Sequence, residues 1–242
     1  MANLLVEIGN TALKASWSEG TVIGKTFRYQ GEKMMDFILS LTEKEKPEVL
    51  AVATANFISD AEENILAKEC GHLLILDKNH RETLKEYGLP DYLSYDRAAG
   101  LVAVRSLFKG KACTLFDLGT ILTVDFLSRS GQFLGGNISP GCRTRFKSVQ
   151  RYSKSLPLVD TPDEIIREGD SLEASIGSGI ISGIMFEIEG YIALHPENIV
   201  VFTGGDANYF AKRMKNPIFV ISNLVLMGMG IITEDYVRKD IQ

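Results

Sequence analysis

Two stretches of this chain share one pattern, and the repetition restricts the folds that the chain can adopt. Residues 114–125 read TLFDLGTILTVD, an apolar run followed by an acid (Asp117), Gly119, a hydroxyl side chain and a second β-rich run. Residues 4–11 read LLVEIGNT, which is again an apolar run, an acid, a glycine, and amide and hydroxyl side chains. A glycine at such a turn lets backbone N–H groups approach an anion closely. Either copy alone is also an ordinary β-turn, but two copies, each opening about half of the chain, indicate an internal duplication.

The predicted strands and helices between the two motifs also favour a chain of two similar halves. The first half predicts strands at 3–8, 12–16, 22–29, 49–53 and 73–76, and helices at 34–41, 59–68 and 98–108. Its β-β-β-α-β-α-β order is typical of a ribonuclease-H-like or actin-like domain. We therefore predict an α/β protein of two such halves, each a mixed β-sheet flanked by helices, with a cleft between the domains 1–109 and 110–242. The second half also contains an apolar helix at 171–194, which is either a central core helix or the interface of a dimer.

Composition excludes several classes of function. A formal charge of -5 gives no basic footprint for nucleic acid. No uninterrupted apolar run reaches the roughly 18 residues of a membrane span, and the first ten residues lack a signal-type pattern. Three cysteines and three histidines are scattered, which fits neither a disulfide framework nor a transition-metal site. We expect a cytoplasmic protein that binds neither membrane nor nucleic acid.

Three polar segments are candidate binding loops. Residues 87–97 are dense in aromatic and polar side chains and lead into a helix, so Asp96 and Arg97 come near a helix N-terminus, where an anion is favoured. The alternative there is a plain capping aspartate with a surface arginine. Residues 135–141 (GGNISPG) predict close packing beside the strand end, or a β-bulge with a turn. Residues 203–206 (TGGD) join a strand to a helix, a geometry for backbone approach to a nucleotide that also occurs without a ligand.

Taken in this order, the motifs resemble those of type III pantothenate kinases, in the acetate/sugar kinase–Hsp70–actin superfamily. That family opens with Asp-x-Gly-Asn-Thr-x-x-Lys/Arg, and residues 7–14 here read EIGNTALK. The resemblance continues over nearly the whole chain, at Tyr87, Pro90, Asp96 and Arg97, at Asp117, Gly119, Thr120, Thr123 and Asp125, and at residues 135–141 and 203–206.

The resemblance implies transfer of the γ-phosphoryl group of ATP to pantothenate, the first step of coenzyme A biosynthesis. It also implies Mg²⁺ brought with the nucleotide, a monovalent cation (K⁺ or NH₄⁺) and a homodimer with pantothenate sites near its interface.

The family's residue roles carry over by matching positions. Asp96 would be the catalytic base and Asp117 would bind the monovalent cation. The ATP-binding residues would be Glu7, Ile8, Gly9, Asn10, Thr11, Ala12, Leu13, Lys14, Thr120, Gly204 and Gly205. Pantothenate would be held by Tyr87, Ser94, Tyr95, Asp96, Arg97 and Ser171.

Four positions depart from the family pattern. Glu7 replaces an aspartate, Ser94 a glycine, Ile121 an alanine and Ser171 a threonine. None of the four changes removes a charge, which favours an active kinase. Two alternatives stay open: a catalytically impaired nucleotide-binding regulator of the same fold, and a kinase for another small hydroxy compound.

Overall fold

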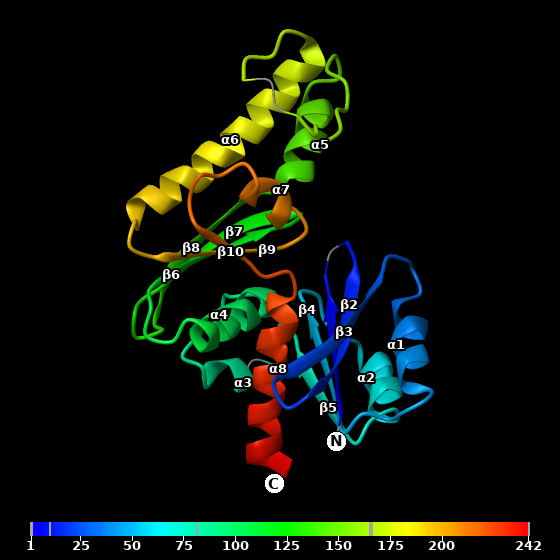
Figure 1. The fold of residues 1–242 in the computed structure, drawn as a ribbon. Coiled ribbons are helices and arrows are strands. Elements are labelled where there is room, and N and C mark those ends of the chain that lie inside the picture. Colours follow the sequence, from blue (N-terminus) through cyan, green and yellow to red (C-terminus); the bar gives the residue numbers. More distant parts are fainter. Residues whose placement is uncertain (1, 10, 81, 165–166, 242) are drawn as a thin grey trace. The chain divides into compact units, whose positions relative to one another are not determined.

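The computed structural model describes residues 2–9, 11–80, 82–164 and 167–241. The chain folds into two compact units (Figure 1). The first combines Met1–Leu107 with Asn223–Gln242, and the second is Phe108–Ser222. Each unit contains one five-stranded sheet.

The first sheet has the strand order β3-β2-β1-β4-β5. Its strands are β1 (Asn3–Ile8), β2 (Leu13–Glu19), β3 (Val22–Tyr29), β4 (Val49–Thr54) and β5 (His72–Leu76). β1, β2 and β3 pair antiparallel, whereas β4 runs parallel to both β1 and β5. β4 is buried along its whole length, which explains its continuous apolar sequence VLAVAT.

Helices cover both faces of this sheet. α1 (Met34–Thr42) and α2 (Asp60–Ala67) supply Ile38 and Leu66 to a core that also contains Leu4 and Val6 of β1. Because side chains alternate along a strand, Leu5 points to the opposite face, towards α8 (Leu224–Tyr236).

Two helices of the first unit pack closely against each other. Figure 1 shows α8 beside α4 (Tyr95–Leu107), and many residues of the two helices are in contact. At the crossing, a Cβ on Gly228 would lie 1.8 Å from the carbonyl oxygen of Ala99. Glycine is therefore required there for the two backbones to approach. A short helix, α3 (Glu82–Lys85), and a π-helical turn, η1 (Val237–Ile241), complete the unit.

The second sheet repeats the first. Its strands are β6 (Cys113–Leu118), β7 (Ile121–Leu127), β8 (Phe133–Pro140), β9 (Ile199–Thr203) and β10 (Ile218–Val220), in the order β10-β9-β6-β7-β8. Numbered from the first strand of each unit, both sheets run third, second, first, fourth, fifth, with the same parallel and antiparallel pairs. This confirms the predicted fold class of two ribonuclease-H-like halves.

Three helices belong to the second unit: α5 (Cys142–Tyr152), α6 (Leu172–Leu194) and α7 (Ala207–Ala211). Among the residues that the structure describes, α6 is the one helix long and apolar enough to cross a membrane. Its side chains Ile181, Ile184 and Ile188 are fully buried, however, in a core shared with Phe116 and Phe202 of the sheet. This packing is that of a core helix.

The structure differs from the expected elements in three places. α8 packs within the first unit, although the division at residue 110 assigned it to the second. α4 begins at Tyr95 rather than at residue 98, because the Ser94 carbonyl already accepts the N–H of Ala98 at 2.9 Å. β8 continues through residues 135–140 with a register shift against β7, which is the β-bulge alternative for the glycine pair.

Candidate active site

The turn between β1 and β2 places an acid and a lysine side by side. Glu7 and Lys14 are partners in the antiparallel register, and Lys14 Nζ lies 3.5 Å from Glu7 Oε2. The turn is closed by the Gly9 N–H, which donates to the Ala12 carbonyl at 3.1 Å. Asn10, predicted to bind ATP, lies outside the described residues.

Lys14 compensates the negative charge of the buried Glu7 carboxylate only in part. Its Oε2 atom is buried and makes no hydrogen bond within the described part of the chain. Burial raises the pKa of Glu7; the positive charge of Lys14 opposes this effect, and the negative charge of Asp96 adds to it. A buried carboxylate in this state is stabilised by an arriving cation.

Asp96 lies in the first turn of α4 and belongs to the same charged cluster. Its Oδ1 accepts the Arg97 N–H at 2.9 Å, and its charge acts on Glu7. Arg97 itself is buried, with 6% of its surface exposed. The structure therefore brings Asp96 to Glu7 and Lys14, from which it is separated by more than 80 positions in the sequence.

The loop before α4 is held from several directions. Tyr87 donates its hydroxyl proton to Asp235 Oδ2 at 2.6 Å, and its carbonyl oxygen accepts from Arg105 Nη1 at 2.6 Å. Tyr95 is buried, with 2% of its surface exposed, and its hydroxyl donates to the His80 carbonyl. The Tyr95 side chain therefore anchors the start of α4. Ser94, half-buried, accepts the first helical N–H of α4 through its carbonyl.

In the second unit, Asp117 lies near the end of β6 and the turn after β9 packs against it. Gly204 has φ +93°, and a Cβ at this residue would lie 2.5 Å from both Asp117 Oδ1 and the Leu118 carbonyl oxygen. Only glycine satisfies both conditions. The Asp206 N–H then donates to the Leu118 carbonyl at 2.8 Å, which ties this turn to β6.

The start of α5 packs against the turn between β6 and β7. The Thr120 carbonyl accepts the Gly141 N–H at 3.1 Å and the Thr144 hydroxyl at 2.6 Å. A Cβ on Gly141 would lie only 1.9 Å from the Gly119 carbonyl oxygen. Close packing, one of the two alternatives for residues 135–141, is therefore found at Gly141, and it fixes the backbone at Gly119 and Thr120.

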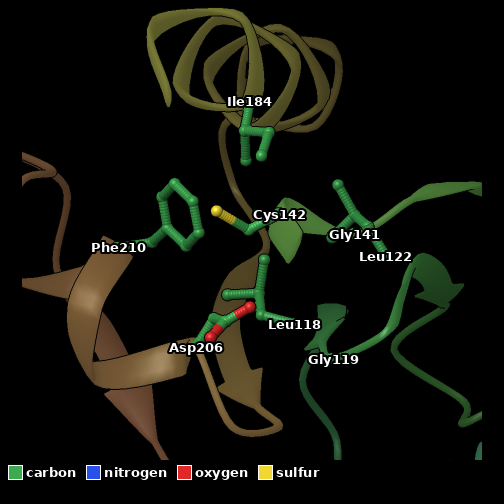
Figure 2. Close-up of a pocket in the computed structure, with 8 residues that line it drawn as sticks. All are labelled: Leu118, Gly119, Leu122, Gly141, Cys142, Ile184, Asp206 and Phe210. Atoms are coloured by element: carbon green, nitrogen blue, oxygen red, sulfur yellow. The ribbon is translucent and has the colours of Figure 1, made fainter. Parts of the chain in front are cut away.

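Figure 2 shows a crevice beside this turn. It leaves no room for a water molecule, and Asp206 contributes the acid to its otherwise apolar or small lining. Burial raises the pKa of Asp206. The lining residues are Leu118, Gly119, Leu122, Gly141, Cys142, Ile184, Asp206 and Phe210. The crevice is thus a closely packed region that supports the turn, and it is not a ligand pocket.

Ser171, the remaining predicted pantothenate contact, is the N-cap of α6. Its Oγ accepts the Ala174 N–H at 3.2 Å, and the residue is exposed. The hydroxyl proton is free to be donated elsewhere while the oxygen caps the helix.

Two residues that hold Tyr87 were not among the predicted site residues. Arg105 lies on α4 and Asp235 on α8. Asp235 is 148 positions from Tyr87 in the sequence. A pattern of residues close together in the sequence does not predict a contact over this separation. Only a co-varying pair in related sequences would have revealed it.

Two sheets of the same strand order, each with a glycine turn between its first two strands and an acid near the end of the first, define the actin-like fold class. A family model described as type III pantothenate kinase matches residues 3–194. The chain belongs to the type III pantothenate kinase family, and it is an enzyme of the kinase class.

Individual relatives agree with this assignment. The chain is 35% identical over 235 residues to a type III pantothenate kinase of Cytophaga hutchinsonii, covering 95% of this chain and 97% of the relative. It is 34% identical over 238 residues to one of Bacteroides fragilis, covering 95% and 96%. Among solved structures, the activator of 2-hydroxyisocaproyl-CoA dehydratase from Clostridium difficile has a similar fold, with a TM-score of 0.59 at 13% identity over 99% of this chain and 96% of that one.

Proposed function

We propose that this chain transfers the γ-phosphoryl group of ATP to the primary hydroxyl of pantothenate, the first step towards coenzyme A. Family membership identifies the reaction, and the observation that carries it to this chain is the cluster of Glu7, Lys14 and Asp96. Phosphoryl transfer depends mainly on alignment and on neutralisation of charge, with little covalent chemistry from the protein. A lysine, a turn of backbone N–H groups and a carboxylate base supply those needs.

Asp96 is the catalytic base of the proposal. It accepts the proton of the pantothenate hydroxyl as that oxygen attacks phosphorus. It lies in the first turn of α4, and the hydrogen bond from the Arg97 N–H to one of its oxygens restrains the carboxylate. Arg97, Ser94, Tyr87 and Ser171 bind the rest of the substrate.

The nucleotide and its cations fit the residues present. Glu7 Oε2, a buried oxygen without a hydrogen-bond partner in the described structure, suits a cation carried by the phosphates. Asp117, with Gly204 packed against it, suits a monovalent cation, because a Cβ would close the space beside its carboxylate. Such cations supply neutralisation of the phosphate charge. Within the described residues no three His, Cys, Asp or Glu side chains gather as a metal centre, which accords with Mg²⁺ held largely by phosphates and water.

Residues 7–14 would contact the phosphates of ATP. Thr120, Gly204 and Gly205 would also contact the nucleotide. In support, the Thr120 carbonyl is fixed by two hydrogen bonds from α5, so the turn is organised before ATP arrives.

The decisive test measures ADP release with ATP and magnesium, with and without pantothenate, in potassium and in sodium buffer. We expect release that requires pantothenate and is faster in potassium. Replacing Asp96 by Asn should lower kcat by about 10²- to 10⁴-fold, the usual contribution of a general base. Asp91→Asn is the matched control, because Asp91 is an exposed carboxylate of the same loop. An Asp96→Asn enzyme within threefold of the wild type would rule out this mechanism.

We also propose that the protein is a homodimer of the cytoplasm, paired through one face of the second unit. Large apolar side chains are exposed on adjoining elements, namely Phe186 of α6 (69%) and Leu134 and Ile138 of β8 (57% and 62%). The bond from the Ser139 hydroxyl to Glu187 at 2.7 Å shows that these elements are neighbours. Phe186→Glu should convert a dimer to a monomer in light scattering, and a wild-type monomer would refute the proposal.

A further inference from the structure

Tyr87 is held by an arrangement that its proposed role in binding does not explain. The side chain is half-buried, and its hydroxyl donates to Asp235 of α8 at 2.6 Å. Burial and the adjacent negative charge of Asp235 raise the pKa of Tyr87. The phenol therefore keeps its proton, and the direction of the O–H bond is set by the carboxylate.

The backbone of the same residue is fixed from another helix. Arg105 of α4 donates from Nη1 to the Tyr87 carbonyl at 2.6 Å. The neighbouring Glu86 is paired with Lys239, one helical turn beyond Asp235. Gly88, at φ +61°, turns the chain immediately afterwards, and its N–H donates to the Lys85 carbonyl at 2.9 Å. Side chain and backbone of Tyr87 are thus both anchored.

We propose that Asp235 is a positioning residue for pantothenate, acting through Tyr87. This inference rests on the proposed function. Because the only proton of the phenol is given to Asp235, the Tyr87 oxygen can offer the substrate only its lone pairs. It therefore selects a hydrogen-bond donor, and pantothenate carries such donors in its hydroxyl groups and its amide N–H. A phenol free to rotate would donate or accept and would lose this selectivity.

The test is a double-mutant cycle with Tyr87→Phe and Asp235→Leu. If Asp235 acts through Tyr87, each single variant should raise the KM for pantothenate by roughly 3- to 10-fold, the effect of losing one hydrogen bond. In Asp235→Leu, the KM for ATP and kcat should stay within twofold of the wild type. In the double variant the KM should be no higher than in either single one. Asp235→Asn keeps an acceptor oxygen and should restore most of the affinity.

Glu234→Gln is the matched control, because it removes a charge next to Asp235 from a side chain that pairs with Arg238 at 3.2 Å. Its KM for pantothenate should equal that of the wild type. Additive effects of the two substitutions on KM, or an Asp235→Leu enzyme with unchanged KM, would overturn the proposal.

A second readout separates this inference from the proposed function. The same cycle applied to unfolding without substrate should show coupling of roughly 10- to 100-fold in the unfolding equilibrium, as expected for a hydrogen bond to a charged group. A wild-type protein that fails to phosphorylate pantothenate refutes the function, whatever the coupling. Active enzyme without coupling in unfolding refutes the contact, and with it the role of Asp235.

Discussion

Replacing Gly204 by alanine tests whether the turn after β9 is built around Asp117. Gly204 has φ +93°, where an L-residue is strained by about 1–2 kcal/mol. The added Cβ would also lie 2.5 Å from the Asp117 carboxylate and from the Leu118 carbonyl, and such overpacking destabilises by about 1–3 kcal/mol. Together these effects predict a loss of roughly 2–5 kcal/mol in the stability of the second unit.

Gly205→Ala provides the control at the next position. A Cβ there would meet nothing within 4 Å, the residue is exposed, and its φ is not among the positive ones. Calorimetric scans should show a fall in Tm of roughly 4–20 °C for Gly204→Ala, at about 2–4 °C per kcal/mol for a chain of this size. Gly205→Ala should melt within about 2 °C of the wild type, since substitutions at exposed positions usually change stability little. Equal melting of the two variants would refute the packing argument.

The remaining predictions concern the first unit. Gly228→Ala should lower the free energy of unfolding by about 1–3 kcal/mol, because its Cβ would lie 1.8 Å from the Ala99 carbonyl oxygen. The control Gly230→Ala, whose Cβ would meet Leu5 Cδ1 at 3.6 Å, should be tolerated. Urea titrations of both variants measure the difference. Glu7→Gln should raise Tm at pH 8 but not at pH 4. The pKa of Glu7 is raised on folding, so the folded state loses stability as the pH rises through that pKa, and below the unfolded value of 4.5 both states carry the proton. The same variant should lose ATP-dependent activity, and a lower Tm at pH 8 would show that the pair with Lys14 outweighs burial.

Most strands could be predicted from the sequence because they are short apolar runs, whereas the glycine pair at 135–136 concealed the continuation of β8. The first turn of α4 was missed for a physical reason. Tyr95 and Arg97 look like loop residues by polarity, but tertiary contacts bury both of them, and the Tyr95 hydroxyl finds an acceptor on His80. Local pattern cannot report burial that distant residues create.

The site was predictable in part. Motif spacing identified Glu7, Lys14 and Asp96, and the structure places the three in one cluster. Their roles in the reaction remain predictions. The contact of Asp235 with Tyr87 was not predictable, since the sequence around an acid in an apolar helix does not indicate which distant residue it will bind.

The position of α8 could not be predicted either, because it depends on contacts with residues far away in the sequence. Its apolar side chains and glycines predict a buried helix, but they do not say which sheet it covers. The contact of Gly228 with Ala99 decides this, and such a contact is visible only in three dimensions.

The placement of α8 also has a consequence for the order in which the protein matures during synthesis. The second unit is one continuous segment, so it is complete once residue 222 has been made. The first unit lacks α8 until residues 223–242 follow, which takes about 1–4 s at usual translation rates. During that interval the surface of α4 that receives Gly228 is uncovered, including Ala99. The first unit therefore receives α8 only after every residue of the second unit has been made.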